Sequence, residues 1–129
     1  MSSERMRRVN EAIREVIGEV ASKELKDPRV GFVTVTDVKT SPDLRHARVY
    51  VSALDRGGHA IAAHDREATL AGLRSAHGYI QHRVADELQL KHTPVLSFVY
   101  DDTPERAERV GELIDAVRER GEEQEEETA

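Results

Sequence analysis

The spacing of apolar residues changes repeatedly along this chain of 129 residues, and these changes restrict its possible folds. Residues 6–20 carry an apolar stripe at intervals of mainly three and four, which is typical of one helix face. Residues 31–40 and 45–53 instead alternate between apolar and polar side chains, as half-buried strands do. Helical spacing returns from Leu70 to Leu88, a short apolar strand follows at 95–100, and helical spacing resumes from Ala107 to Val117.

Local signals set the boundaries of these segments. Asp27 precedes Pro28 and therefore avoids the helical region, so the first helix should end near Leu25. The turn residues 41–43, Ser-Pro-Asp, join the two alternating segments into a hairpin. Asp65 is in position to cap the middle helix, and Thr103 with Pro104 to begin the last helix, which we expect to end at Gly121.

The predicted order is helix, strand, strand, interrupted helix, strand, helix. Because a helical crossover separates the third strand from the hairpin, that strand can lie parallel to one already in the sheet. We therefore predict an α+β domain with a three-stranded mixed sheet and helices on one face. This domain should span residues 1–121, and residues 122–129 should form an acidic disordered tail.

The net charge of −6 comes mostly from the acidic residues at the end of the chain. Five glutamates and no basic residue follow Gly121, so residues 1–121 hold 19 basic and 20 acidic side chains. A nearly neutral domain is weak support for a polyanionic partner, although local fields decide where one binds. The chain has no cysteine and no apolar run near the roughly 18 residues that span a membrane. We expect a soluble, cytoplasmic monomer.

No residue pattern indicates catalysis or a bound cofactor. His77 and His82 are five residues apart, as are His59 and His64, whereas a helix presents zinc ligands three or four apart. Nucleophile elbows and phosphate-binding loops of known pattern are missing. The two acids at 101–102 suggest paired carboxylates, but directly before a helix they are better explained as helix-start residues. We predict a protein that is not an enzyme and needs no metal or cofactor.

The most informative stretch is residues 73–84, where Ala76-His77-Gly78 interrupts an amphipathic helix. A broken helix can present backbone N–H groups and a positive end to phosphate. Alternatively, Gly78 serves packing alone and the nearby arginines are solvated. The residues by themselves leave both interpretations open. The candidate RNA-binding residues here are Arg74, Ser75, Ala76, His77, Gly78, Gln81, His82 and Arg83.

Further basic residues complete the candidate set, and they lie in the first helix, in the hairpin turn and after the interrupted helix. Many charges of the first helix are interleaved with acids, as on an ordinary solvated helix surface. The additional RNA-binding candidates are Arg5, Arg8, Arg14, Arg45 and Lys91.

Several long motifs resemble those of the ribosome-binding factor A family. They are RVNEAIREVI, ELKDPRVGFVTVTDVKTSPDLRHARVYVS and LRSAHGYIQHRVADELQLKHTPVLSFVYDD, in order between about residues 5 and 114. The resemblance implies a type II KH-like fold in which an Ala-x-Gly kink, matched by residues 76–78, replaces the GxxG loop of ordinary KH domains. It also favours the RNA-binding interpretation of the kink, although ordinary KH-style sequence recognition is then in doubt.

The resemblance further implies a non-catalytic assembly factor. Its partner would be the free small ribosomal subunit and its precursors, not joined ribosomes, with ribosomal proteins and other assembly factors as further partners. Its role would be late maturation and 5′-end processing of the small-subunit RNA, which supports bacterial growth in the cold. An alternative from another class is a protein adaptor that docks on a ribosomal protein with little RNA contact.

Overall fold

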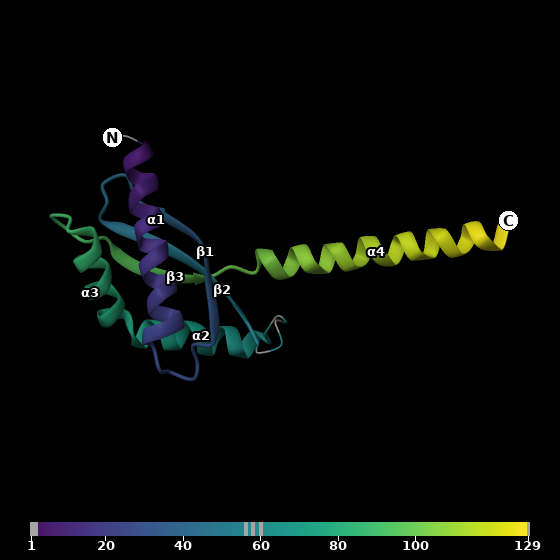
Figure 1. Cartoon of the computed structure of the whole chain (residues 1–129), viewed down its shortest axis with the longest axis horizontal. Coiled ribbons are helices and arrows are strands. Elements are labelled where there is room, and N and C mark those ends of the chain that lie inside the picture. Colours follow the sequence, from purple (N-terminus) through teal and green to yellow (C-terminus); the bar gives the residue numbers. More distant parts are fainter. Residues whose placement is uncertain (1–2, 56, 58, 60, 129) are drawn as a thin grey trace.

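The computed structural model describes residues 3–55, 57, 59 and 61–128 and confirms the predicted α+β class (Figure 1). The elements follow the predicted order, with the interrupted helix present as two helices. Their bounds are α1 Ser3–Glu19, a π-helical turn η1 Val20–Glu24, β1 Phe32–Thr40, β2 His46–Leu54, α2 Ala63–Ser75, α3 His77–Leu88, β3 Val95–Tyr100 and α4 Thr103–Thr128.

The sheet has the order β1-β2-β3, with β1 antiparallel and β3 parallel to β2, as the helical crossover predicted. A register shift between Val35 and Asp37 inserts an extra residue into β1. Strict alternation would put Val35 and Val38 on opposite faces, whereas the bulge buries both on the helix-covered face. The sequence analysis missed this bulge because alternation assumes a constant period of two.

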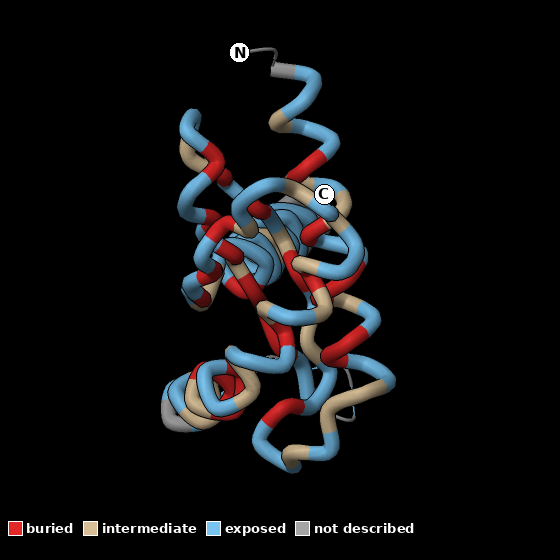
Figure 2. The backbone as a smooth tube through the Cα atoms, turned by 90° about the vertical axis from the view of Figure 1, so that its left-hand side faces the viewer, coloured by how far each residue is buried: buried red, intermediate tan, exposed pale blue. Residues whose placement is uncertain are grey.

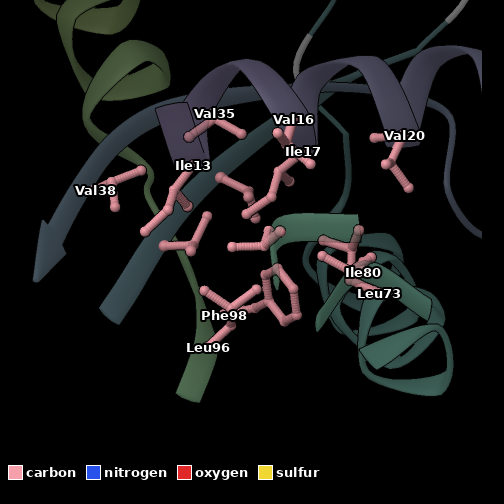
Figure 3. Packing of buried hydrophobic residues seen from close by; sticks show 14 of the residues in the cluster. Ile13, Val16, Ile17, Val20, Val35, Val38, Leu73, Ile80, Leu96 and Phe98 are labelled. Atoms are coloured by element: carbon pink, nitrogen blue, oxygen red, sulfur yellow. The ribbon is translucent and has the colours of Figure 1, made fainter. Parts of the chain in front are cut away.

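The hydrophobic core lies between one face of the sheet and the helices α1, α2 and α3 (Figures 1 and 3). Ile13 and Ile17 of α1, Leu73 of α2 and Ile80 of α3 all belong to this core, and all four are fully buried. Along the backbone, buried positions alternate with exposed ones, as expected when each element covers the core with one face (Figure 2).

The interrupted helix breaks at Ala76 and not at Gly78. Ala76 ends α2 and begins α3 with φ −91° and ψ 9°, outside the helical region. Gly78 lies inside α3. The middle helix also begins earlier than predicted, at Ala63, and no side chain caps it, so Asp65 is a first-turn acid and not the cap.

The last helix differs most from the prediction. It continues past Gly121 to Thr128, because one helical glycine costs only about 1 kcal/mol and glutamate is a good helix former. It projects away from the sheet and the other helices (Figure 1), and its stripe from Val110 to Val117 is exposed. The division between domain and acidic tail stays a prediction.

Candidate nucleic-acid interface

A shallow groove of ≈ 520 Å³ lies beside the helix break, between α3 and the start of β3. We call it the kink groove. It is lined by His77, Gly78, Gln81, His82, Ala85, Thr93 and Val95. Four of the predicted RNA-binding residues therefore share one surface, because positions 77, 78, 81 and 82 fall on the same side of α3.

Two of these groove residues hold α3 against the sheet. The Gln81 amide donates to the carbonyl of Pro94 (2.6 Å) and its oxygen accepts the N–H of Leu96 (3.2 Å). The ring Nε2 of His77 lies 3.0 Å from the Leu96 carbonyl oxygen. These contacts occupy backbone groups on the outer edge of β3, which would otherwise be unpaired. His77 and Gln81 therefore shape the groove as well as lining it.

Gly78 leaves the groove open. A Cβ atom added there would meet nothing within 4 Å, so this glycine is not required by close packing within the described part of the chain. The packing explanation offered for it above is therefore wrong. The N-cap residue of α3 is Ala76, which makes no side-chain hydrogen bond to the first turn of this helix.

The cations that flank the break differ from one another. The Arg74 side chain is exposed and makes no hydrogen bond or ion pair with another described residue. Arg83 is instead bound to Glu24, with Nε 3.2 Å from Oε1. Ser75 accepts a hydrogen bond from the guanidinium of Arg29 (3.1 Å), and His82 lies 3.4 Å from the carboxylate of Asp86. Arg74 is therefore the cation beside the break that can approach a phosphate without losing a partner.

A second hollow, of ≈ 240 Å³, gathers three other predicted residues: Arg5, Arg45 and Lys91. Leu90 to His92 line it, and Thr93 and Val95 line the kink groove, so one loop borders both. Asp43 is the acid in this hollow. Its carboxylate accepts hydrogen bonds from the Ser41 hydroxyl (2.6 Å) and the Arg45 N–H (3.1 Å), which lower its pKa.

The sequence analysis did not include three residues on the uncovered face of the sheet, Lys39, His46 and Arg48. They line a hollow of ≈ 440 Å³, and His46 is paired in register with Val95 of the kink groove. Lys39 lies opposite Arg48, an unfavourable like-charge pair. The Tyr50 side chain contacts both cations. Lys39 Nζ lies over its ring, 5.4 Å from the centroid, and Arg48 Nη1 donates a hydrogen bond to its hydroxyl (3.4 Å). The alternation of β2, which puts His46 and Arg48 opposite its apolar face, was the signal available.

Two of the predicted RNA-binding residues, Arg8 and Arg14, lie away from the kink groove. Arg8 pairs with Glu4 on the exposed side of α1 (3.3 Å). Arg14 lines a hollow with Arg7 and Asp37, beside β1 at the other edge of the sheet from β3. The structure therefore does not bring Arg8 or Arg14 to the kink groove.

Charge is polarised along the strands. The end of the sheet where β2 and β3 begin carries a cluster that we call the basic end: Arg5, Lys39, Arg45, His46, Arg48, Lys91 and His92. The opposite end carries Asp101, Asp102 and Glu105 at the start of α4, of which Asp102 pairs with Arg106 and Glu105 lies near Arg66. Local concentration of positive charge can thus attract a polyanion although the chain is acidic overall. Among the described residues, no three potential metal ligands gather, and no helix is long and apolar enough to cross a membrane.

The fold and the broken helix together define a type II KH-like α+β domain. Comparison with known proteins then identifies the family. The family model for ribosome-binding factor A matches residues 5–114, and the chain belongs to this family. It is 39% identical to ribosome-binding factor A of Halothermothrix orenii over 127 residues, which cover 98% of this chain and 99% of that protein.

Structures of ribosome-binding factor A from another bacterium have a similar fold. The crystal structure of ribosome-binding factor A from Thermus thermophilus matches with a TM-score of 0.60 and 23% identity, covering 74% of this chain and 94% of that one. A homology model of the Thermus thermophilus protein, fitted into a cryo-EM map of its complex with the 30S subunit, matches with a TM-score of 0.56 and 24% identity. It covers 78% of this chain and 96% of that one. These structural likenesses support the fold.

Proposed function

We propose that this protein binds the RNA of the free small ribosomal subunit and its precursors through the kink groove and the basic end. The observation that carries the proposal is that both surfaces meet at one loop, residues 90–95. Arg5 and Lys91 line the hollow beside this loop and Arg74 lies in the last turn of α2, next to the break; all three are exposed cations without an ion-pair partner among the described residues. Such cations can bind phosphates without first breaking a bond within the protein.

The proposed role is occupancy without catalysis, in the cytoplasm and as a monomer. The bound protein would hold the subunit RNA in one conformation during late maturation and 5′-end processing, and would leave before subunits join. Family membership supports this role, as does the complex of the Thermus thermophilus protein with the 30S subunit. The small, open groove suits RNA better than a reaction centre, which needs converging catalytic groups.

Co-sedimentation with purified small subunits across a salt series tests the proposal. Neutralising Z phosphates makes the logarithm of the binding constant fall with the logarithm of salt concentration, with a slope of roughly −0.7Z to −0.9Z. We expect a steep slope on free subunits and loss of binding on joined ribosomes. Absence of binding at low salt would contradict the proposal.

A protein adaptor remains the second candidate, because α4 presents an unpaired apolar stripe. Val110, Leu113, Ile114 and Val117 are 48–64% exposed on one side of this projecting helix. Amphipathic helices of this kind dock into grooves of other proteins. If the adaptor function dominates, binding to subunits should depend only weakly on salt and should be lost in Leu113→Ser. RNA binding predicts a steep salt dependence that Leu113→Ser leaves unchanged.

A further inference from the structure

The segment that starts at Glu24, the last residue of η1, and runs toward β1 contacts the helices on both sides of the break, on the flank of α3 away from the kink groove. We call residues 24–30 the strap. It contacts α2 before the break, where a Cβ on Gly72 would lie only 2.7 Å from Cγ2 of Val30. Side chains of the strap, Val30 above all, therefore pack against α2 as closely as a glycine permits. This contact fixes the strap against the last turns of α2.

Polar contacts extend this attachment to both sides of the break. Asp27 accepts hydrogen bonds from the Arg29 guanidinium at 2.6–3.1 Å and orients it, and Arg29 in turn donates to Ser75, directly before Ala76. After the break, Glu24 accepts a hydrogen bond from the Tyr79 hydroxyl (2.7 Å) and pairs with Arg83. One short segment thus holds the end of α2 and the start of α3.

The strap and the groove lie on opposite flanks of α3. At 100° per residue, Tyr79 and Arg83 point to one flank, His77 and Gln81 to the other, and Ile80 faces the core between them. The hydrogen bonds to β3 hold the groove flank, and Glu24 holds the strap flank. Ala76, whose backbone angles lie outside the helical region, connects α2 to α3. The direction of α3 therefore depends on contacts at both flanks.

We propose that the strap fixes the angle at the α2–α3 break, and that Glu24 and Arg83 are positioning residues for the kink groove. Arg83 then acts through Glu24 and does not contact phosphate. This inference deepens the proposed function, on which its consequence for binding rests. Its geometric part can be tested without any RNA.

Spin labels across the break measure the geometry directly. The chain has no cysteine, so Glu67→Cys in α2 and Glu87→Cys in α3, both at exposed positions, can be labelled specifically. The distribution of distances between the two spin labels is measured in the labelled protein and in the same labelled protein carrying Glu24→Gln, Arg83→Gln or both. Tyr79→Phe, which removes one hydrogen bond, is a milder variant if the others fail to fold. Lys26→Gln is the matched control, because Lys26 is an exposed strap residue without a partner among the described residues.

Subunit binding of the same variants is measured across the salt series. We expect Glu24→Gln and Arg83→Gln to broaden the distance distribution and to weaken binding by similar factors, roughly threefold to tenfold. The double variant should be no worse than either, because both act through one contact. The salt slope should stay that of the wild type, since no phosphate contact is lost. Lys26→Gln should change neither quantity.

Other outcomes separate the inference from the proposed function. An unchanged distance distribution in Glu24→Gln overturns the inference, as does a broadened distribution with unchanged binding. The inference is also overturned if Arg83→Gln flattens the salt slope by about 0.7–0.9 while Glu24→Gln binds normally. A change of that size corresponds to the loss of one phosphate contact, so Arg83 would then bind RNA directly. If the wild type itself shows no binding to subunits, the proposed function fails. The distance distributions then still decide whether the strap fixes the break.

Discussion

Arg83 of α3 and Glu24 of η1 are 59 residues apart in sequence and form an ion pair, with Nε 3.2 Å from Oε1. Their side chains are only 27% and 28% exposed, so the pair is partly shielded from water. The sequence analysis assigned Arg83 to RNA together with Arg74. The structure separates the two arginines, because one has an internal partner and the other points freely into solvent.

Arg74→Glu should therefore weaken subunit binding without affecting the fold. The side chain is exposed and unpaired among the described residues, so its replacement should change the free energy of unfolding by less than about 0.5 kcal/mol. The loss of one phosphate contact should flatten the salt slope by about 0.7–0.9. Arg109→Glu, an exposed arginine on α4, is the control and should leave binding unchanged. Equal effects of both variants would show that total charge matters and the kink does not.

Arg48→Glu should weaken binding while slightly stabilising the protein. Lys39 and Arg48 lie directly opposite each other in the sheet, where like charges are unfavourable. Reversing one charge converts repulsion into attraction, worth a few tenths of a kcal/mol at a surface site. Urea denaturation measures the stability and co-sedimentation the binding. Destabilisation would show that repulsion between Lys39 and Arg48 does not weaken the sheet, and unchanged binding would show that this face of the sheet does not contact the ligand.

Two glycines near the break should respond to alanine in opposite ways. Gly72→Ala forces a Cβ to within 2.7 Å of Val30, and the overpacking should cost about 1–3 kcal/mol in the free energy of unfolding. Gly78→Ala meets open space inside a helix and should stabilise the fold by up to about 1 kcal/mol. Because the new methyl group would enter the kink groove, Gly78→Ala should nevertheless weaken subunit binding. A stabilised variant with normal binding would show that RNA does not approach Gly78.

Local patterns predicted the fold well, because each element follows its own hydrophobic period. The stripe around Ile13 and Ile17, the alternation of β2 and the turn at Pro42 each act over a few residues. The bulge after Val35 could not be predicted this way, since it depends on pairing with β2. The end of α4 was also missed, because glycine and like charges weaken a helix without forbidding it.

The candidate site was only partly predictable for a related reason. Sequence neighbours such as His77 and Gln81 reach one groove because helical spacing places them on one side. The partner of Arg83 comes from a segment 59 residues away, and no local pattern links it to Glu24. Arg5 and Lys91 are likewise brought together by the fold alone. Long-range pairing decides which basic residues are free and which already have partners.

The contact between Glu24 and Tyr79 should be visible in the titration of tyrosine. Hydrogen bonding to the Glu24 carboxylate raises the pKa of Tyr79, and the Tyr79 and Arg83 hydrogen bonds lower the pKa of Glu24. The Tyr79 contribution to stability is therefore present below the unfolded pKa of tyrosine and is lost as pH rises through the folded pKa. The Glu24 contribution is present above the unfolded pKa of glutamate and is lost as pH falls through its folded pKa.

Ultraviolet absorbance of tyrosinate follows this titration. Glu24→Gln should lower the pKa of Tyr79, and Tyr79→Phe identifies which transition belongs to that residue. Burial raises the pKa of Tyr100, and this second raised transition should not move in Glu24→Gln because Tyr100 lies near Glu105 and not near the strap. An unchanged Tyr79 transition would contradict the contact.

The start of α4 should matter for stability, whereas the rest of the helix should not. Glu105 is 3% exposed; it accepts a hydrogen bond from the Tyr100 hydroxyl (2.8 Å) and lies 3.6 Å from Arg66. Arg66 in turn stacks over the Tyr100 ring at 5.2 Å. Glu105→Ala would leave the Arg66 guanidinium partly buried without its counter-charge, at a cost of roughly 1–3 kcal/mol. Glu108→Ala, one turn along the same helix and exposed, is the matched control and should change stability by less than about 0.5 kcal/mol.

Deletion of residues 109–129 extends this prediction to the whole projecting segment. From Ala107 to Glu122 nearly every side chain is exposed, so the deletion removes little buried surface and should leave the midpoint of urea denaturation close to that of the wild type. The truncated chain still contains Glu105, so Arg66 and Tyr100 retain their contacts with it. A large loss of stability on deletion would show that α4 packs on the domain in solution and that its apolar stripe is covered there. Wild-type stability of Glu105→Ala would instead show that the contacts of Glu105 do not anchor the helix.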